Sequence, residues 1–87
     1  MKCPLVDCDT DVPATARPKG ADGSLIQCPR CGRFEIDGTL HASDEFSKHT
    51  NLMDGLRAFI KSENEAGRTP VLGTMTWQQE ASAHKPS

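Results

Sequence analysis

Cys28-Pro29-Arg30-Cys31-Gly32 is the stretch that decides how this 87-residue chain folds. Two residues between the cysteines allow one tight turn to present both sulfurs to a metal ion, while backbone N–H groups of the turn point at the sulfurs. Gly32 supplies the positive φ that such a turn needs. We therefore expect a metal-binding turn at residues 28–31.

Short segments of strand character lie on both sides of this turn. In residues 33–36 the side chains of Phe34 and Ile36 fall on one face at period two, and residues 24–28 form the matching segment before the turn. Prolines and glycines interrupt any helix throughout residues 1–37. The sequence therefore predicts an antiparallel hairpin that passes through the cysteine turn, preceded by an exposed loop at residues 18–24.

A second pair of cysteines, Cys3 and Cys8, has four intervening residues, which lies within the range of about two to four that is typical of zinc ligands. An even number of cysteines in a chain without an apolar leader indicates a reducing, cytoplasmic setting, where metal binding is expected before disulfides. One alternative leaves Cys8 free and takes His41 or His49 as the fourth ligand. The predicted metal ligands are Cys3, Cys8, Cys28 and Cys31.

Over residues 3 to about 37, these two pairs resemble the zinc-ribbon superfamily, in which two cysteine turns at the tips of β-hairpins clamp one zinc ion. The resemblance implies Zn²⁺ as cofactor and a zinc ribbon over residues 1–38. A usual first turn reads Cys-Pro-x-Cys, whereas here Val6 stands in the place of the second cysteine, so we expect a widened turn ending at Cys8. The chain also resembles short bacterial and phage-borne proteins that place a ribbon before a helix like residues 56–70.

The pattern changes from strand to helix after residue 42. Ser43 suits a helix N-cap, and Gly67 followed by Pro70 suits a helix end. We predict one long helix over residues 44–66, with Gly55 as the point of any bend, and a short terminal helix over residues 76–84 that begins with a capping box. The predicted apolar stripe of the long helix consists of Phe46, Leu52, Met53, Leu56, Phe59 and Ile60.

The predicted fold class is a small metal-stabilised α+β domain, in which the helical tail of residues 39–87 packs on the ribbon. Only 36% of the residues are hydrophobic, with one tryptophan and no tyrosine. Binding of a structural zinc ion is worth on the order of 10–16 kcal/mol, so the metal compensates for a thin core. We expect no membrane association, because no apolar run approaches the roughly 20 residues that a membrane span needs.

Four thiolates leave zinc no open position for substrate, so we expect a structural metal and no enzyme. No serine–histidine–carboxylate pattern or phosphate loop is present in the sequence. The apolar run of residues 71–77 suits a docking surface for a larger protein or a homodimer contact. The predicted function is therefore that of an adaptor or regulator, and its predicted anchors are Met53, Phe59, Met75 and Trp77.

Two other functions compete with the adaptor. Nucleic-acid binding is the main alternative, although the net charge of −2 and the pI near 5.8 are not typical of that class. Electron transfer by iron, as in rubredoxin, is a further alternative, but the head of the chain offers only Phe34 as aromatic cover. The predicted nucleic-acid contacts are Arg17, Lys19, Arg30 and Arg33.

Overall fold

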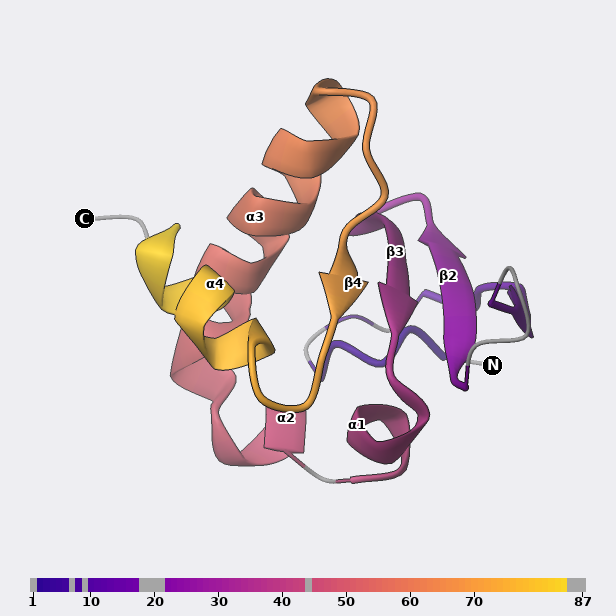
Figure 1. The fold of residues 1–87 in the computed structure, drawn as a ribbon, viewed down its shortest axis with the longest axis horizontal. Coiled ribbons are helices and arrows are strands. Elements are labelled where there is room, and N and C mark those ends of the chain that lie inside the picture. The colour runs from indigo at the N-terminus through magenta and orange to yellow at the C-terminus, as the bar shows by residue number, and fades with distance from the viewer. Residues whose placement is uncertain (1, 7, 9, 18–21, 44, 85–87) are drawn as a thin grey trace.

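The computed structural model describes residues 2–6, 8, 10–17, 22–43 and 45–84. Its sheet has four short strands in the order β1-β2-β3-β4 (Figure 1). Neighbouring strands among the first three are antiparallel, so the predicted hairpin through the cysteine turn is confirmed. These strands are β1 (Ala14–Ala16), β2 (Ser24–Cys28) and β3 (Gly32–Ile36).

The fourth strand, β4 (Val71–Leu72), comes from the segment predicted as a helical tail. It pairs parallel to β3, and backbone N–H groups of Glu35 and Asp37 donate to the carbonyls of Pro70 and Leu72 at 2.9 and 3.0 Å. Leu72 is fully buried. This short apolar run joins the sheet because doing so buries Leu72 and gives the backbone groups at the free edge of β3 hydrogen-bond partners.

The prediction of one long helix over residues 44–66 is wrong, because the helical segment is broken. The structure has helix α2, a 3-10 turn η2 and helix α3 in its place, and an additional short helix, α1, before them. The helices are α1 (Gly38–Ala42), α2 (Glu45–Lys48), η2 (Thr50–Leu52), α3 (Met53–Glu65) and α4 (Trp77–Ala83).

The break lies at His49, whose backbone leaves the helical region with φ −132° and ψ 49°. Gly55, where a bend was expected, lies inside the continuous helix α3. The residues at the break, His49, Thr50 and Asn51, all have modest helix propensity. The change of direction brings Phe46 edge-on to Trp77, with ring centroids 4.8 Å apart. Tertiary packing of Phe46 therefore outweighs continuation of the helix.

The ends of α3 and α4 were predicted better than the interior. Gly67 has φ +82°, and the N–H groups of Gly67 and Arg68 donate to the carbonyls of Asn64 and Glu63, which is the Schellman arrangement. The predicted end of the helix at Gly67 is therefore confirmed. Helix α4 also forms, but Thr76 makes no side-chain capping bond, so the predicted capping box is absent.

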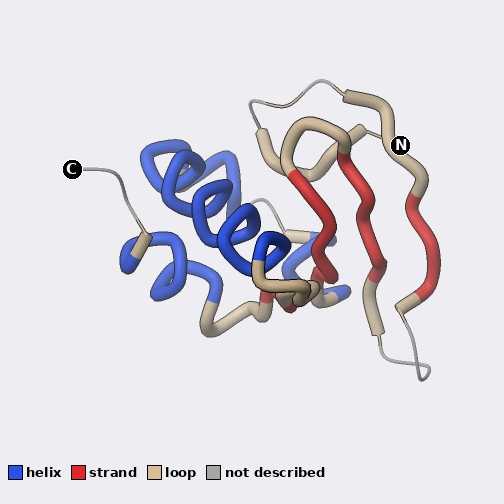
Figure 2. Tube along the Cα trace, turned by 90° about the horizontal axis from the view of Figure 1, so that it is seen from above, coloured by secondary structure: helices blue, strands red, loops and turns tan. Residues whose placement is uncertain are grey.

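The α3–α4 pair lies on one side of the sheet, as Figure 2 shows from above. Helix α3 packs against β3 on one side and against α4 on the other. The stripe predicted for the long helix is buried in this core, so most of it is covered within the chain. None of the described helices has the length and apolar character that crossing a bilayer needs. The largest fully buried side chains are Leu5, Ile26, Phe34, Ile36, Leu40, Met53, Leu56, Ile60, Leu72 and Trp77.

Candidate metal centre

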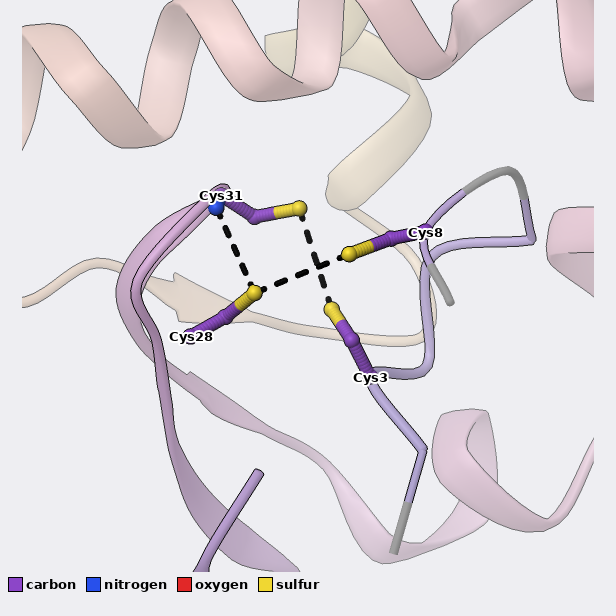
Figure 3. A group of neighbouring side chains, drawn as sticks. All are labelled: Cys3, Cys8, Cys28 and Cys31. Atoms are coloured by element: carbon purple, nitrogen blue, oxygen red, sulfur yellow. Dashed lines mark hydrogen bonds between the residues drawn. The ribbon is translucent and has the colours of Figure 1, made fainter. Parts of the chain in front are cut away.

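The four cysteines converge on one buried point at the end of the β2–β3 hairpin (Figure 3). Their sulfurs all lie within 4.8 Å of one another, and no cysteine is more than 5% exposed. Two pairs, Cys3–Cys31 and Cys8–Cys28, have Sγ–Sγ distances of 3.8 and 3.6 Å. A tetrahedron around zinc with Zn–S bonds of about 2.3 Å has edges of about 3.8 Å, so this donor set fits a tetrahedral ion.

The same distances exclude disulfides in this arrangement. A disulfide needs an S–S distance of about 2.05 Å, whereas the cysteines here are all free thiols. Both sulfurs of the first turn lie beside a sulfur of the second turn. Four converging sulfurs that are close but unbonded are what a metal-thiolate centre requires.

The second cysteine turn is positioned by the hairpin that carries it. Cys28 ends β2 opposite Gly32, and the backbone N–H of Cys31 donates to Cys28 Sγ at 3.3 Å. Gly32 has φ +109°, as the sequence predicted for this position. A Cβ at Gly32 would lie 2.6 Å from Asn64 Oδ1 and 2.8 Å from a methyl carbon of Ile60, so helix α3 also approaches too closely for a side chain.

The first turn is widened, as expected, and still brings Cys8 into the cluster. The N–H of Cys3 donates to the carbonyl of Thr10 at 2.9 Å, and Lys2 and Asp11 form an antiparallel bridge beside it. The N–H of Cys8 donates to the carbonyl of Leu5, whose side chain is fully buried. Longer spacing is therefore accommodated by a turn that points Leu5 into the core.

The alternative with a histidine as fourth ligand has no support among the described residues. Within them, the group of side chains that could hold a metal consists of the four cysteines alone. His49 Nε2 instead lies 3.5 Å from Glu45 Oε2, and its ring packs on Trp77. His41 lies in α1, away from the sulfur cluster.

The thiols perturb one another because they are so close. The hydrogen bond between the side chains of Cys3 and Cys31 lowers the pKa of Cys3 to about 5. The same contact, together with burial, raises the pKa of Cys31 well above its ordinary value, and burial raises the pKa of Cys28. Without a cation the four thiols cannot all ionise at neutral pH, whereas a bound divalent ion favours all four thiolates.

Most of the predicted partner anchors are core residues. Trp77 and Met53 are each 1% exposed and Phe59 is 7% exposed, so none of them offers a surface to a partner. These three predicted anchors therefore lie in the core, where α4 packs against α3, and not on the surface that a docking role needs. Met75 differs, since it is 84% exposed.

Arg17, one of the predicted basic residues, is paired with a carboxylate. Arg17 donates to Glu35 Oε1 at 2.9 Å and to the carbonyl of Asp22, near the end of the hairpin opposite the cysteines. Arg33 lies two residues before Glu35 on β3, and Arg30 lies in the cysteine turn. Lys19 lies outside the described residues.

Asn64 is the supporting residue that sequence reasoning does not find. Its side-chain oxygen accepts from the N–H of Arg33 at 2.8 Å, and its side-chain amide donates to the carbonyls of Arg33 and Arg68 at 2.9 and 3.0 Å. The carboxamide thus pairs with β3 as a neighbouring strand would, directly after the second cysteine turn. Asparagine near a helix end reads as a helix-ending residue, so no local signal announces this contact.

No protein-family model, curated protein or solved structure matches this chain. The resemblance to zinc ribbons therefore rests on the cysteine cluster and the small antiparallel sheet beside it.

Proposed function

We propose that the four cysteines bind one zinc ion as thiolates and that the role of this ion is structural. The observation that carries the proposal is the convergence of four buried sulfurs within 4.8 Å. Four thiolates complete a tetrahedral shell, so such an ion has no open position for water or substrate. The residues proposed to hold it are Cys3, Cys8, Cys28 and Cys31.

We favour zinc over iron as the bound metal because of the cysteine spacing in the first turn. Rubredoxin-like sites use two Cys-x-x-Cys turns, whereas the turn from Cys3 to Cys8 has four intervening residues. The burial of the sulfurs suits either metal. Elemental analysis is therefore the deciding measurement.

The fold held by this ion is proposed to act as an adaptor or regulator that binds a larger protein. The net charge of −2 becomes more negative when four thiolates bind one divalent ion, which disfavours general attraction to nucleic acid. The pairing of Arg17 with Glu35 supports the same preference, because it reduces the positive charge that a phosphate backbone would meet. Met75, exposed at 84%, is the anchor that remains available to a protein partner.

The metal proposal is tested by elemental analysis of protein produced without added metal, with native mass spectrometry for stoichiometry. We expect one zinc per chain, and much weaker zinc retention in Cys8→Ser and Cys28→Ser. Ser62→Ala, a change at an exposed position of α3, serves as a matched control that retains the metal. Iron in place of zinc, or full metal retention by Cys8→Ser, would contradict the proposed site.

The adaptor proposal is tested by photo-crosslinking from position 75 in cells that produce the protein. We expect a discrete protein adduct from position 75 and none from position 48, which is also exposed but lies on α2. Nuclease treatment should leave the adduct unchanged. Loss of the adduct after nuclease treatment would favour the nucleic-acid alternative.

A further inference from the structure

A groove of about 560 Å³ lies between the second cysteine turn and helix α3. Cys31 is among the residues that line it, together with Pro29 of the turn and Ala58 of the helix. The other three cysteines do not belong to the described lining of this groove. Of the four proposed ligands, Cys31 is therefore the one that a small molecule in the groove would meet.

Surface exposure alone does not distinguish the four cysteines. Each of them is between 3% and 5% exposed, so a reagent has to reach the sulfurs through a cavity. Hydrogen peroxide is uncharged and only slightly larger than water, which occupies about 30 Å³ in the liquid. The groove has room for such a molecule, and charged side chains on its walls do not repel it.

A second sulfur lies next to Cys31 on the other cysteine turn. Cys3 Sγ is 3.8 Å from Cys31 Sγ (Figure 3). A disulfide has an S–S distance of about 2.05 Å, so these sulfurs would have to approach each other by about 1.8 Å. Oxidised cysteines are commonly resolved by a neighbouring thiolate of this kind.

We propose that Cys31 is an oxidation site at which hydrogen peroxide converts the metal centre into a Cys3–Cys31 disulfide. The proposal rests on the zinc-thiolate site proposed above. The Cys31 thiolate attacks one peroxide oxygen, the O–O bond breaks, and hydroxide leaves, so that Cys31 becomes a sulfenic acid. The Cys3 thiolate then attacks the sulfur of Cys31, and a second hydroxide leaves as the S–S bond forms. Two thiolates thus give two electrons to one peroxide, and two protons from solvent convert both hydroxides to water.

This oxidation removes two of the four proposed metal ligands. Cys8 and Cys28 remain, with their sulfurs 3.6 Å apart, but two thiolates do not complete the tetrahedral shell of a structural zinc ion. The affinity for zinc should therefore fall, and the ion should be released. The new disulfide joins the first turn to the hairpin in place of the metal. A thiol reductant should restore the thiolates and with them zinc binding.

The test treats the full zinc-loaded chain with hydrogen peroxide, after elemental analysis has measured its zinc content. With dimedone present to trap sulfenic acids, we expect the first adduct on Cys31. Without dimedone, we expect one Cys3–Cys31 disulfide for each zinc ion released. Trypsin cleaves after Arg30 and Arg33, which places Cys31 and Cys28 in different peptides. Mass spectrometry therefore distinguishes a disulfide between the two turns from one within the second turn.

A side chain that fills the groove should slow this reaction. In Ala58→Phe, the rate of peroxide-dependent zinc release should fall about tenfold, because access to Cys31 is reduced. The matched control Ala66→Phe adds the same ring at an exposed position at the end of α3, outside the described lining. The control should change the rate less than about twofold. Zinc loss to a chelator without peroxide should be the same in Ala58→Phe as in the native chain, because no ligand is altered.

Several outcomes would overturn the inference. These are a first adduct on any cysteine other than Cys31, a Cys28–Cys31 disulfide, and zinc release that is no faster with peroxide than without it. Equal peroxide-dependent rates in Ala58→Phe and the native chain would show that the groove is not the route. If Ala58→Phe fails to hold zinc, adduct mapping on the native chain decides. Absence of zinc from the native chain would contradict the proposed function itself, whereas each of the other outcomes leaves the zinc site in place.

Discussion

Both cysteine turns contain a local hydrogen bond, but the second lies within a paired β-hairpin, whereas the first is flanked by a single β-bridge. In the second turn, the N–H of Cys31 donates to Cys28 Sγ, and Gly32 supplies the positive φ. In the first turn, Cys3 pairs with Thr10, and the side chain of Leu5 is buried in the core. Each turn thus supplies two sulfurs, although the local structure that positions them differs between the two turns.

The two cysteine turns are therefore stabilised by different interactions. Local hydrogen bonds and a strand pairing that continues through the turn make residues 28–32 a preformed half of the site. Among its described residues, the first turn has one bridge beside it, between Lys2 and Asp11, two backbone hydrogen bonds made by Cys3 and Cys8, and the buried side chain of Leu5. Metal binding should therefore order the first turn more than the second.

Of the changes considered, removal of the metal is expected to affect the stability of the two turns most. Chelation at neutral pH should unfold most of the chain, because structural zinc contributes on the order of 10–16 kcal/mol to such folds. During stepwise removal, amide protection at Cys3 and Cys8 should be lost at a lower chelator concentration than protection in residues 24–36. Hydrogen exchange measured at each step checks the order.

Re-addition of zinc should restore both segments. The opposite order of loss, or simultaneous loss at every chelator concentration, would contradict the view that the second turn is preformed. Full protection in the metal-free protein would show that the core alone supports the fold.

Leu5→Ala should destabilise the zinc-loaded protein by about 2–5 kcal/mol, because it creates a cavity under the first turn. Leu5 is 0% exposed, whereas its neighbour Val6 is 40% exposed. The matched control Val6→Ala should therefore cost less than about 1 kcal/mol. Denaturant unfolding at a fixed free zinc concentration measures both.

If Leu5→Ala and Val6→Ala lowered the free energy of unfolding by similar amounts, burial of Leu5 would not be what holds the first turn. Metal affinity is a second readout for the same pair of variants. It should fall for Leu5→Ala more than for Val6→Ala, since the cavity loosens the positions of Cys3 and Cys8.

Local signals explain the parts of the structure that could be predicted. The hairpin through Cys28 and Cys31 follows from spacing, alternation and one glycine, all within about a dozen residues. The helix end at Gly67 depends on a conformation that glycine adopts readily. Convergence of Cys3 and Cys8 on the same point follows from pairing of the two cysteine turns.

Long-range packing explains the parts that could not be predicted. The break at His49 depends on the contact between Phe46 and Trp77, which are 31 positions apart. Strand β4 depends on the free edge of β3, and that edge is not visible in the run Val71-Leu72. Trp77 looks like a docking anchor near the end of the printed sequence, yet the fold of α4 against α3 buries it.

Gly32→Ala tests the second turn and should cost about 1–3 kcal/mol. The alanine would have to keep the backbone angle φ of +109°, and its Cβ would lie 2.6 Å from Asn64 Oδ1. Gly67→Ala is the matched control, because Gly67 has φ +82° but no atom lies within 4 Å of an added Cβ. The control should cost only the backbone strain, about 1 kcal/mol. Thermal unfolding of the zinc-loaded variants compares the two, and equal costs would show that α3 is not in close contact with the turn.

Asn64→Ala should have a smaller effect, of about 1–2 kcal/mol, because water can reach the backbone groups that the change leaves unpaired. These groups are the N–H and carbonyl of Arg33, directly after the second turn. Asn51→Ala, at an exposed position of η2, is the control and should be nearly neutral. Hydrogen exchange gives the sharper readout, since protection should fall at Arg33 in the Asn64 variant while protection at Cys3 stays unchanged. A loss of protection in both turns would mean that Asn64 supports the whole metal site rather than the hairpin half alone.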